Sequence, residues 1–161
     1  MGHQNVAVLN GGLPDWLAQS FPTENIKPQQ YDLSNFNALL NTEKVKDYHF
    51  IKNNTQSVVI DARSEGRFKG TAPEPREGLR SGSIPNSFNI PFETVLEDGK
   101  FKSKAALKTI FSKINLDNKE LVYSCGSGLT ACIILLAGEL IFPNTTAVYD
   151  GSWTEWAQIE K

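Results

Sequence analysis

The sequence predicts an α/β fold, an open parallel sheet with helices on both faces. Two short runs, 57–61 (SVVID) and 120–124 (ELVYS), are too apolar in the middle for strands that keep one face in water. Helical patterns lie between such runs, so strands and helices alternate along the chain. Alternation of this kind favours a parallel sheet whose ligands bind at the carboxyl ends of the strands. We therefore look for a functional site after Asp61 and Ser124.

The composition is that of a packed, soluble domain. The chain has 161 residues, 40% of them hydrophobic and 21% charged, and a net charge of -2. That charge gives no overall electrostatic footprint for nucleic acid or an anionic membrane. The longest apolar run, 131–142, is shorter than the roughly 20 residues that cross a bilayer and predicts a buried helix. No signal peptide is recognisable, so the expected location is the cytoplasm.

The first 21 residues are expected to close a preceding domain. Residues 6–16 (VAVLNGGLPDW) align without gaps with residues 146–156 (TAVYDGSWTEW), and each copy predicts a strand, a turn and a helix start carrying Trp. If whole domains are duplicated, residues 1–21 are the closing strand and helix of a truncated N-terminal domain. Residues 22–30, with Pro22 and Pro28, then form an interdomain linker, and residues 31–161 form the C-terminal catalytic domain.

Two helices are expected within that domain before the second central strand. One runs from Thr42, a plausible N-cap, to about Asn53, and the other covers residues 103–113 with Ser103 as its cap. The second pattern places four apolar side chains on one face, Leu107, Ile110, Phe111 and Ile114. Both helices are predicted to cover the sheet.

The loop that begins at Cys125 is the strongest functional signal. A strand delivers Cys125 into Gly126-Ser127-Gly128, and an apolar helix follows from about Thr130 to Leu140. Two glycines let successive backbone N–H groups turn inward at a helix N-terminus, which stabilises a thiolate and lowers the pKa of its thiol. A buried structural Cys at a tight turn is the alternative. We predict that Cys125 is a nucleophile.

The other cysteine and the histidines predict no further site. Cys132 lies seven residues after Cys125 within the apolar helix, so we expect it in the core, a resolving thiol being the alternative. His3 and His49 are the only histidines, and surface or packing roles are expected for both. Neither a disulfide framework nor zinc-like spacing is present, and no metal or cofactor is predicted.

The Cys125 loop, together with other segments, resembles the rhodanese sulfurtransferases. The resemblance covers residues 31 to the end. Its further segments are 57–63 (SVVIDAR), 82–85 (GSIP), 89–91 (NIP) and 148–153 (VYDGSW). The run CGSGLTA at 125–131 is similar to the loop of 3-mercaptopyruvate sulfurtransferases, whereas thiosulfate-using rhodaneses usually carry Arg-Lys-Gly after the Cys. Leu129 departs from the usual Val, and Ser83 stands where many relatives have His.

The resemblance implies roles for several residues. It makes Cys125 the nucleophile and Ser127 a catalytic residue that assists proton transfer or substrate orientation. It places Arg67 and Arg76 at the carboxylate and keto oxygen of the donor, where planar guanidinium forks suit an α-keto acid. It assigns the loop itself to substrate binding, namely Gly126, Gly128, Leu129 and Thr130. Arg63 and Arg80 are expected to be structural.

The expected reaction is transfer of sulfur from 3-mercaptopyruvate through a Cys125 persulfide. A thiol such as thioredoxin, a small dithiol or cyanide then accepts the sulfur, and the missing N-terminal rhodanese domain is the expected partner. Three alternatives stay open. The donor is thiosulfate instead; the chain is a phosphatase of the Cys-x5-Arg type, although Ala131 occupies the place of the Arg; or it is an inactive, rhodanese-like interaction module in this truncated form.

Overall fold

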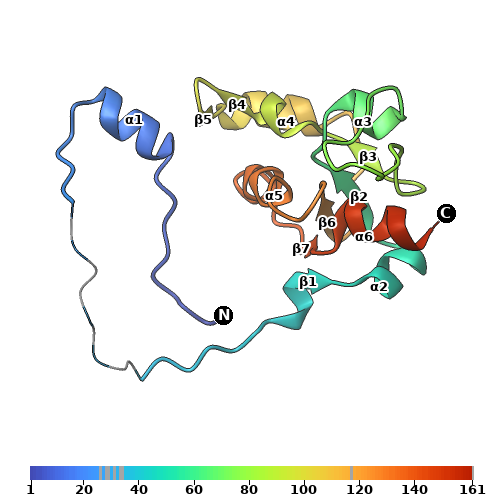
Figure 1. Ribbon diagram of the computed structural model, residues 1–161, viewed down its shortest axis with the longest axis horizontal. Coiled ribbons are helices and arrows are strands. Elements are labelled where there is room, and N and C mark those ends of the chain that lie inside the picture. Colours follow the sequence, from blue (N-terminus) through green and yellow to red (C-terminus); the bar gives the residue numbers. More distant parts are fainter. Residues whose placement is uncertain (26, 28–29, 31, 33–34, 117, 161) are drawn as a thin grey trace.

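The computed structural model contains a five-stranded parallel sheet with the strand order β1-β7-β6-β2-β3 (Figure 1). It describes residues 1–25, 27, 30, 32, 35–116 and 118–160. All four strand pairs are parallel, which confirms the predicted fold class. The strands are β1 (Val45–Lys46), β7 (Thr146–Tyr149), β6 (Leu121–Ser124), β2 (Val58–Asp61) and β3 (Phe88–Asn89).

The two central strands, β2 and β6, alternate their side chains between two apolar cores. Ile60 and Tyr123 belong to the core under α4 (Lys104–Phe111) and α5 (Ala131–Glu139), whereas Val59 belongs to the core under α2 (Tyr48–Lys52) and α6 (Ser152–Ile159). Strands buried on both faces read as continuous apolar runs, which is why these two were recognisable in the sequence. The sheet is therefore covered on both faces by helices.

Smaller elements complete the domain. The short helix α3 (Glu65–Lys69) follows β2, and a 3-10 helix, η2 (Phe92–Val95), follows β3. The strands β4 (Leu96–Glu97) and β5 (Lys100–Phe101) form a separate antiparallel hairpin. Helix α4 has the predicted cap, since Ser103 accepts a hydrogen bond from the N–H of Ala106.

The predicted helix over residues 42–53 is wrong. The segment divides into the 3-10 helix η1 (Thr42–Lys44), capped by Asn41, then β1, then α2. Val45 and Lys46 pair with β7 at the edge of the sheet, and the Asp47 side chain then accepts a hydrogen bond from Phe50 N–H at 2.8 Å to begin a new helix. Tertiary strand pairing and a strong N-cap override the helical pattern.

The N-terminal segment forms a helix but not the expected strand. Helix α1 (Gly12–Ala18) begins after the glycine turn as the repeat predicts, and the second copy of the repeat is β7 followed by α6. Residues 6–10 form no strand, because no described strand lies beside them as β6 and β1 lie beside β7. The segment contacts the hairpin instead, through an ion pair of 2.8 Å between Asp15 and Lys100. Part of the predicted linker at 22–30, and Tyr31, lie outside the described residues.

Candidate active site

The carboxyl ends of β2 and β6 lie next to each other, as the fold class predicts. Asp61 is in register with Ser124, and the N–H of Ala62 donates to the carbonyl of Ser124 at 2.8 Å. The segment that begins at Arg63 and the loop that begins at Cys125 therefore leave the sheet side by side. The candidate site is built from these two loops.

The start of α6 fixes the backbone around Cys125. The N–H of Cys125 donates to the hydroxyl of Ser152 at 3.1 Å, and the carbonyl of Cys125 accepts from the N–H of Trp153 at 2.9 Å. The carbonyl of Gly126 accepts from both the N–H and the hydroxyl of Thr154, at 3.1 and 2.7 Å. These bonds satisfy the outward-facing polar groups of the loop, so its other N–H groups are free to surround the sulfur.

The buried Cys125 thiol accepts several hydrogen bonds from its own loop. Burial alone raises its pKa, because a thiolate loses hydration. Hydrogen bonding from the Thr130 hydroxyl, and from the N–H groups of Ser127, Ala131 and Thr130, acts in the opposite direction. The hydrogen bonds prevail, and the pKa of Cys125 lies below its ordinary value. The thiol is therefore converted more readily into a nucleophilic thiolate.

Gly128 allows the backbone of the Cys125 loop to turn tightly. It is buried with φ at +85°, a left-handed conformation that side chains disfavour. A Cβ atom there would lie 3.1 Å from the carbonyl oxygen of Asp150. Glycine is required at this position by both backbone conformation and space.

Three other predicted loop residues differ in exposure. Ser127 is exposed and, among the described residues, its hydroxyl makes no hydrogen bond, so it is free to contact a substrate. Leu129 is 78% exposed and faces away from the core. Thr130 is half-buried and turned to the sulfur of Cys125. Thr130 thus contacts the nucleophile itself through its hydroxyl, whereas the sequence predicted only a place in the substrate-binding loop.

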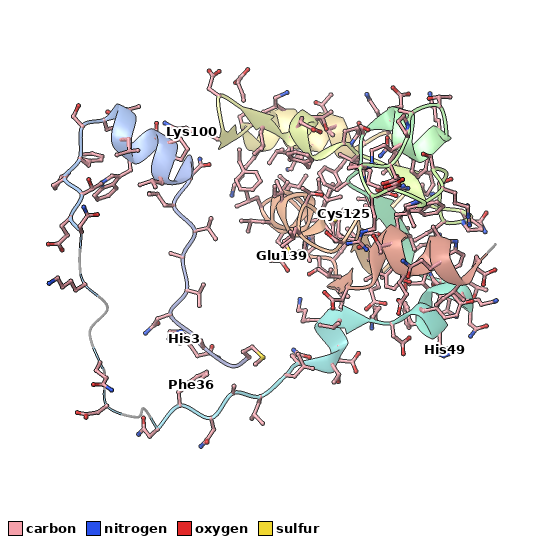
Figure 2. All side chains as sticks on the ribbon, in the orientation of Figure 1. His3, Phe36, His49, Lys100, Cys125 and Glu139 are labelled. Carbon is pink, nitrogen blue, oxygen red and sulfur yellow. The ribbon has the colours of Figure 1, made fainter. Side chains whose placement is uncertain are left out.

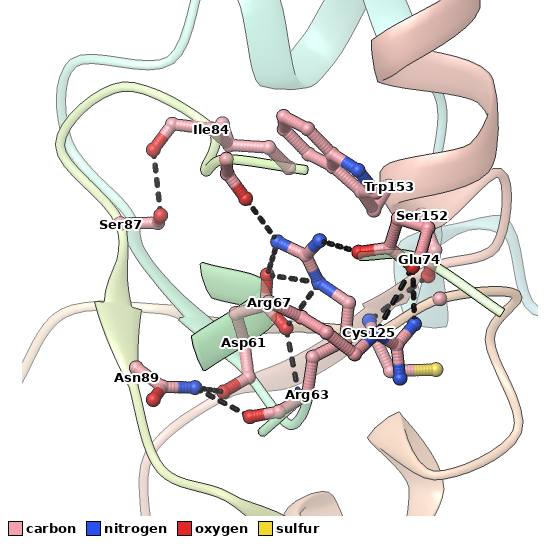
Figure 3. A network of polar contacts seen from close by, with 12 residues as sticks. Asp61, Arg63, Arg67, Glu74, Ile84, Ser87, Asn89, Cys125, Ser152 and Trp153 are labelled. Carbon is pink, nitrogen blue, oxygen red and sulfur yellow. Dashed lines mark hydrogen bonds and ion pairs between the residues drawn. The ribbon is translucent and has the colours of Figure 1, made fainter. Parts of the chain in front are cut away.

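A network of charged side chains follows β2 (Figure 3). The fully buried guanidinium of Arg63 donates to Asp61, to Glu74 and, at 2.6 Å, to the carbonyl of Gly82. Arg67, on α3, donates to the other carboxylate oxygen of Glu74. Burial raises the pKa of Asp61, although hydrogen bonds and charge from Arg63 oppose that effect. Arg63 is thus fully buried and paired, as expected for a structural arginine.

The two arginines predicted to bind the donor occupy different places. Arg67 lies at the loop, since its Nη2 is 3.0 Å from where a Cβ atom on Gly126 would stand. Arg76 is exposed and lines a surface hollow with Arg80 and Gln158. The structure therefore brings Arg67 to the Cys125 loop, whereas Arg76 lies at a hollow that no residue of this loop lines.

Cys132 is exposed, contrary to the expected core position. Its thiol donates to the carbonyl of Gly128 at 3.4 Å, and it borders an apolar hollow of about 400 Å³ lined also by Leu9, Ile133 and Leu136. Every residue near it in α5 is apolar, so no polar residue marked the outward face of the helix. Partial loss of hydration at the Cys132 thiol raises its pKa, and negative charge on Cys125 and Asp150 raises it further. A smaller fraction of Cys132 than of Cys125 is therefore the reactive thiolate.

The histidines lie away from the site. Figure 2 shows His3 on the N-terminal segment and His49 on α2, both far from Cys125. Among the residues that the structure describes, no group of three or more His, Cys, Asp or Glu side chains is arranged to hold a metal ion. No helix in the described part of the chain is long and apolar enough to span a membrane.

Glu74, Ser152 and Trp153 were not identified as site residues from the sequence. Ser152 and Trp153 fall in the closing repeat, whose strand, turn and helix were predicted but whose contact with Cys125 depends on the order of the strands. Glu74 lies in the segment Glu74-Pro75-Arg76, where only the Arg was singled out. Its burial between two arginines has no local sequence signal, because both partners lie on other elements.

Comparisons with known proteins agree with this geometry. The family model described as a rhodanese-like domain matches residues 42–159. The chain is 42% identical to human 3-mercaptopyruvate sulfurtransferase over 160 residues, covering 96% of this chain and 54% of that protein. It is also 42% identical to rat thiosulfate sulfurtransferase over 161 residues, with the same coverage. The chain thus spans about half the length of the curated relatives it matches.

A solved structure gives the same picture in three dimensions. The crystal structure of SseA from Escherichia coli, described as a 3-mercaptopyruvate sulfotransferase with the rhodanese fold, superimposes with a TM-score of 0.75 at 32% sequence identity. The match covers 93% of this chain and 57% of that one. In sequence, the relatives named for 3-mercaptopyruvate and for thiosulfate are about equally similar to this chain, at 42% identity each.

Proposed function

The chain belongs to the rhodanese family, and on that premise we propose that it is a sulfurtransferase in which Cys125 carries sulfur from 3-mercaptopyruvate to an acceptor. The observation that carries the proposal is the hydrogen-bonded Cys125 thiol, whose pKa is lowered despite burial. Ala131, where a Cys-x5-Arg phosphatase needs its Arg, is buried with its N–H turned to the sulfur. The loop therefore favours sulfur chemistry over phosphate transfer.

The first step forms a sulfur–sulfur bond. The Cys125 thiolate attacks the sulfur of 3-mercaptopyruvate, and the carbon–sulfur bond breaks with its electron pair moving to the carbon as an enolate. The proton of the donor's thiol is then transferred to that carbon, which gives pyruvate and leaves the anionic persulfide Cys–S–S⁻. In this proposal the hydroxyl of Ser127, which is exposed, relays the proton.

The second step transfers the outer sulfur to an acceptor. The loop N–H groups and the Thr130 hydroxyl that favour the thiolate also suit a persulfide anion. A thiol such as thioredoxin, a small dithiol or cyanide attacks the outer sulfur and restores the Cys125 thiolate, so a ping-pong pattern is expected. We keep the cytoplasm as the proposed location, because thiols stay reduced there.

Mass spectrometry tests this proposal directly. The chain is mixed with 3-mercaptopyruvate, and the mass of the intact protein and the release of pyruvate are measured together. We expect one added sulfur atom and an equal amount of pyruvate, and neither with Cys125→Ser. The variant Cys132→Ser is the matched control and should accept sulfur as wild type does. Sulfur uptake by Cys125→Ser would overturn the proposal.

Thiosulfate is the second candidate donor, favoured by the equal similarity to thiosulfate sulfurtransferases. The site argues for the keto acid, because Arg67 is already paired with Glu74 and Gly126 has no side chain to add positive charge for a dianion. The ratio of sulfur-uptake rates with the two donors decides between them. We expect 3-mercaptopyruvate to react faster.

We further propose that residues 1–21 belong to a preceding rhodanese domain that forms one wall of the site. Six apolar side chains of this segment are more than half exposed, namely Met1, Val6, Val8, Leu9, Leu13 and Leu17. The internal repeat and the greater length of the relatives support the same proposal. A protein that carries such a domain before residue 1 should turn over faster than this chain with the same donor. Equal turnover would favour an independent domain, and absence of sulfur uptake by this chain alone would favour an inactive module in this form.

A further inference from the structure

Glu74 connects two arginines through its two carboxylate oxygens (Figure 3). Its side chain is 1% exposed. Oε1 accepts from Nη1 of Arg63 at 2.6 Å, and Oε2 accepts from Nε and Nη2 of Arg67 at 3.0 and 2.5 Å. A carboxylate with both oxygens bonded to charged donors is held in one orientation. Glu74 therefore transmits the position of Arg63 to Arg67.

Arg63 is the fixed end of this connection. Its guanidinium donates to both oxygens of Asp61 and lies 4.4 Å from the ring centre of Trp153. Asp61 is the last residue of the central strand β2, and Trp153 is in the first turn of α6, where its N–H donates to the Cys125 carbonyl. Arg63 is thus joined to β2, which pairs with the strand before Cys125, and to α6, which holds the Cys125 backbone.

Arg67 is the end that faces the loop. Its side chain is 24% exposed, and it lies close to Gly126, whose missing Cβ leaves room for Nη2. Glu74 occupies two of the five N–H groups of the guanidinium, one on Nε and one on Nη2. The remaining N–H groups, on Nη1 and Nη2, form an edge that matches the two oxygens of a carboxylate.

We propose that Glu74 is a positioning residue that holds the Arg67 guanidinium beside Gly126, with its free edge presented to the carboxylate of the sulfur donor. The inference rests on the proposed function for the identity of that donor. Asp61 and Glu74 together balance the charges of Arg63 and Arg67. The charge of Glu74 therefore weakens the attraction of Arg67 for an anion, while its hydrogen bonds fix the orientation of the Arg67 guanidinium.

Positioning and charge predict opposite results for Glu74→Gln. Removing the negative charge strengthens the attraction of Arg67 for an anionic donor, so a site that acts by charge alone binds the donor better. A site that acts by position binds it worse, because a Gln side chain has a single acceptor oxygen and cannot satisfy both arginines. The exposed Glu77, in the same loop, supplies the control, since Glu77→Gln makes the same charge change away from Arg67.

The first experiment measures sulfur uptake by Cys125 as a function of 3-mercaptopyruvate concentration. We expect Glu74→Gln to raise the half-saturating concentration about tenfold, as loss of one charge-assisted hydrogen bond does, with little change in the rate at saturation. Glu77→Gln should match wild type. In the Arg67→Ala background, adding Glu74→Gln should have no further effect. Tighter binding in Glu74→Gln, or an equal loss in both backgrounds, would overturn the proposal.

A second variant leaves the buried carboxylate in place, in case Glu74→Gln does not fold. Arg67→Lys keeps the charge, but a single ammonium group cannot reproduce the Nε and Nη2 pair on Glu74. If Glu74 acts by fixing the guanidinium, Arg67→Lys should bind the donor as weakly as Arg67→Ala. If Arg67→Lys retains wild-type binding, charge is sufficient and the proposal is wrong.

Nuclear magnetic resonance separates this inference from the proposed function. The Nε–H signal of Arg67 should be sharp and distinct in wild type and in Glu77→Gln, and averaged with solvent-exposed arginines in Glu74→Gln. Addition of pyruvate or thiosulfate then shows which anion reaches the free edge. A fixed Nε–H signal with no response to pyruvate would contradict the keto-acid donor while leaving the positioning of Arg67 intact. An averaged signal in wild type would contradict the positioning itself.

Discussion

The two loops that form the candidate site stabilise negative charge by different means. After β6, the Cys125 loop uses backbone N–H groups and one hydroxyl and contains no charged side chain from Cys125 to Thr130. After β2, a cluster of four charged residues holds the partly exposed guanidinium of Arg67 at the Cys125 loop. Short-range dipoles suit a sulfur anion at a fixed position, whereas a charged fork suits a diffusing carboxylate. The difference supports the proposal that the first loop holds the sulfur and the second binds the donor's carboxylate.

The largest effect is expected from filling the space between Gly128 of the Cys125 loop and Asp150. Gly128→Ala adds a Cβ atom 3.1 Å from the Asp150 carbonyl at a φ of +85°. The conformational cost is about 1–2 kcal/mol, and the contact adds about 1–3 kcal/mol of strain. Sulfur uptake should fall by at least about tenfold because the N–H groups turn away from the sulfur.

Gly78→Ala is the matched control for this variant. Its φ of +74° imposes a similar conformational cost, and nothing lies within 4 Å of the added atom. Denaturant unfolding should therefore show a smaller loss of stability than in Gly128→Ala, and sulfur uptake should be unchanged. Equal losses in the two variants would show that the Asp150 contact does not matter.

The next effect compares the two arginines that were predicted to bind the donor, Arg67 in the charged cluster and Arg76 outside it. Arg67→Ala should raise the half-saturating concentration of 3-mercaptopyruvate about tenfold or more, as expected for loss of a bidentate carboxylate contact. Arg76→Ala should have a smaller effect, because Arg76 is exposed on a different hollow. Both values come from the rate of sulfur uptake at increasing donor concentration. A larger effect for Arg76 would mean that the donor's carboxylate binds at the hollow lined by Arg76 and not at Arg67.

A smaller effect is expected from Thr130, whose side chain donates a hydrogen bond to the Cys125 sulfur. Thr130→Val removes the hydroxyl that lowers the pKa of Cys125, so that pKa should rise. The thiolate fraction at neutral pH then falls, and sulfur uptake should slow several-fold and recover as the pH is raised. The rate against pH should shift to higher pH in Thr130→Val with the same plateau. An unchanged profile would leave the backbone N–H groups as the whole source of the effect.

The smallest effect is expected for Ser127→Ala. The Ser127 side chain is exposed and makes no hydrogen bond within the described structure, so stability should not change. The rate of pyruvate release at saturating donor should fall a few-fold if the hydroxyl relays a proton. A change in thermal unfolding, or a rate equal to wild type, would remove Ser127 from the proposed mechanism.

The sequence predicted the Cys125 loop better than the charged cluster for a physical reason. The loop is a local motif, in which Cys125, Gly128 and Thr130 adopt their places through neighbouring backbone and the start of one helix. The cluster depends on Glu74, whose partners lie on two other segments. Burial of Glu74 could not be inferred, because Glu is almost never buried unless paired and its pairing is tertiary.

The errors in the fold have the same origin. The residues at 42–53 have a helical pattern, yet Val45 and Lys46 pair with β7, which the chain reaches a hundred residues later. Residues 6–10 have a strand pattern but lack neighbouring strands among the described residues. The central strands β2 and β6 were predicted correctly because burial on both faces marks them locally. The sequence pattern therefore predicts the strands that are buried on both faces, but it does not predict the edge strand β1, which forms by pairing with β7.

The account depends most on the claim that the loop favours the thiolate of Cys125. Titration of the thiolate absorbance in Cys132→Ser, folded and in denaturant, measures this claim with the unfolded chain as its own reference. We predict that Cys125 ionises at lower pH in the folded protein than in the unfolded chain, and below the ordinary pKa of 9.0. An equal or higher pKa in the folded protein would show that burial prevails over the hydrogen bonds, and would contradict the account.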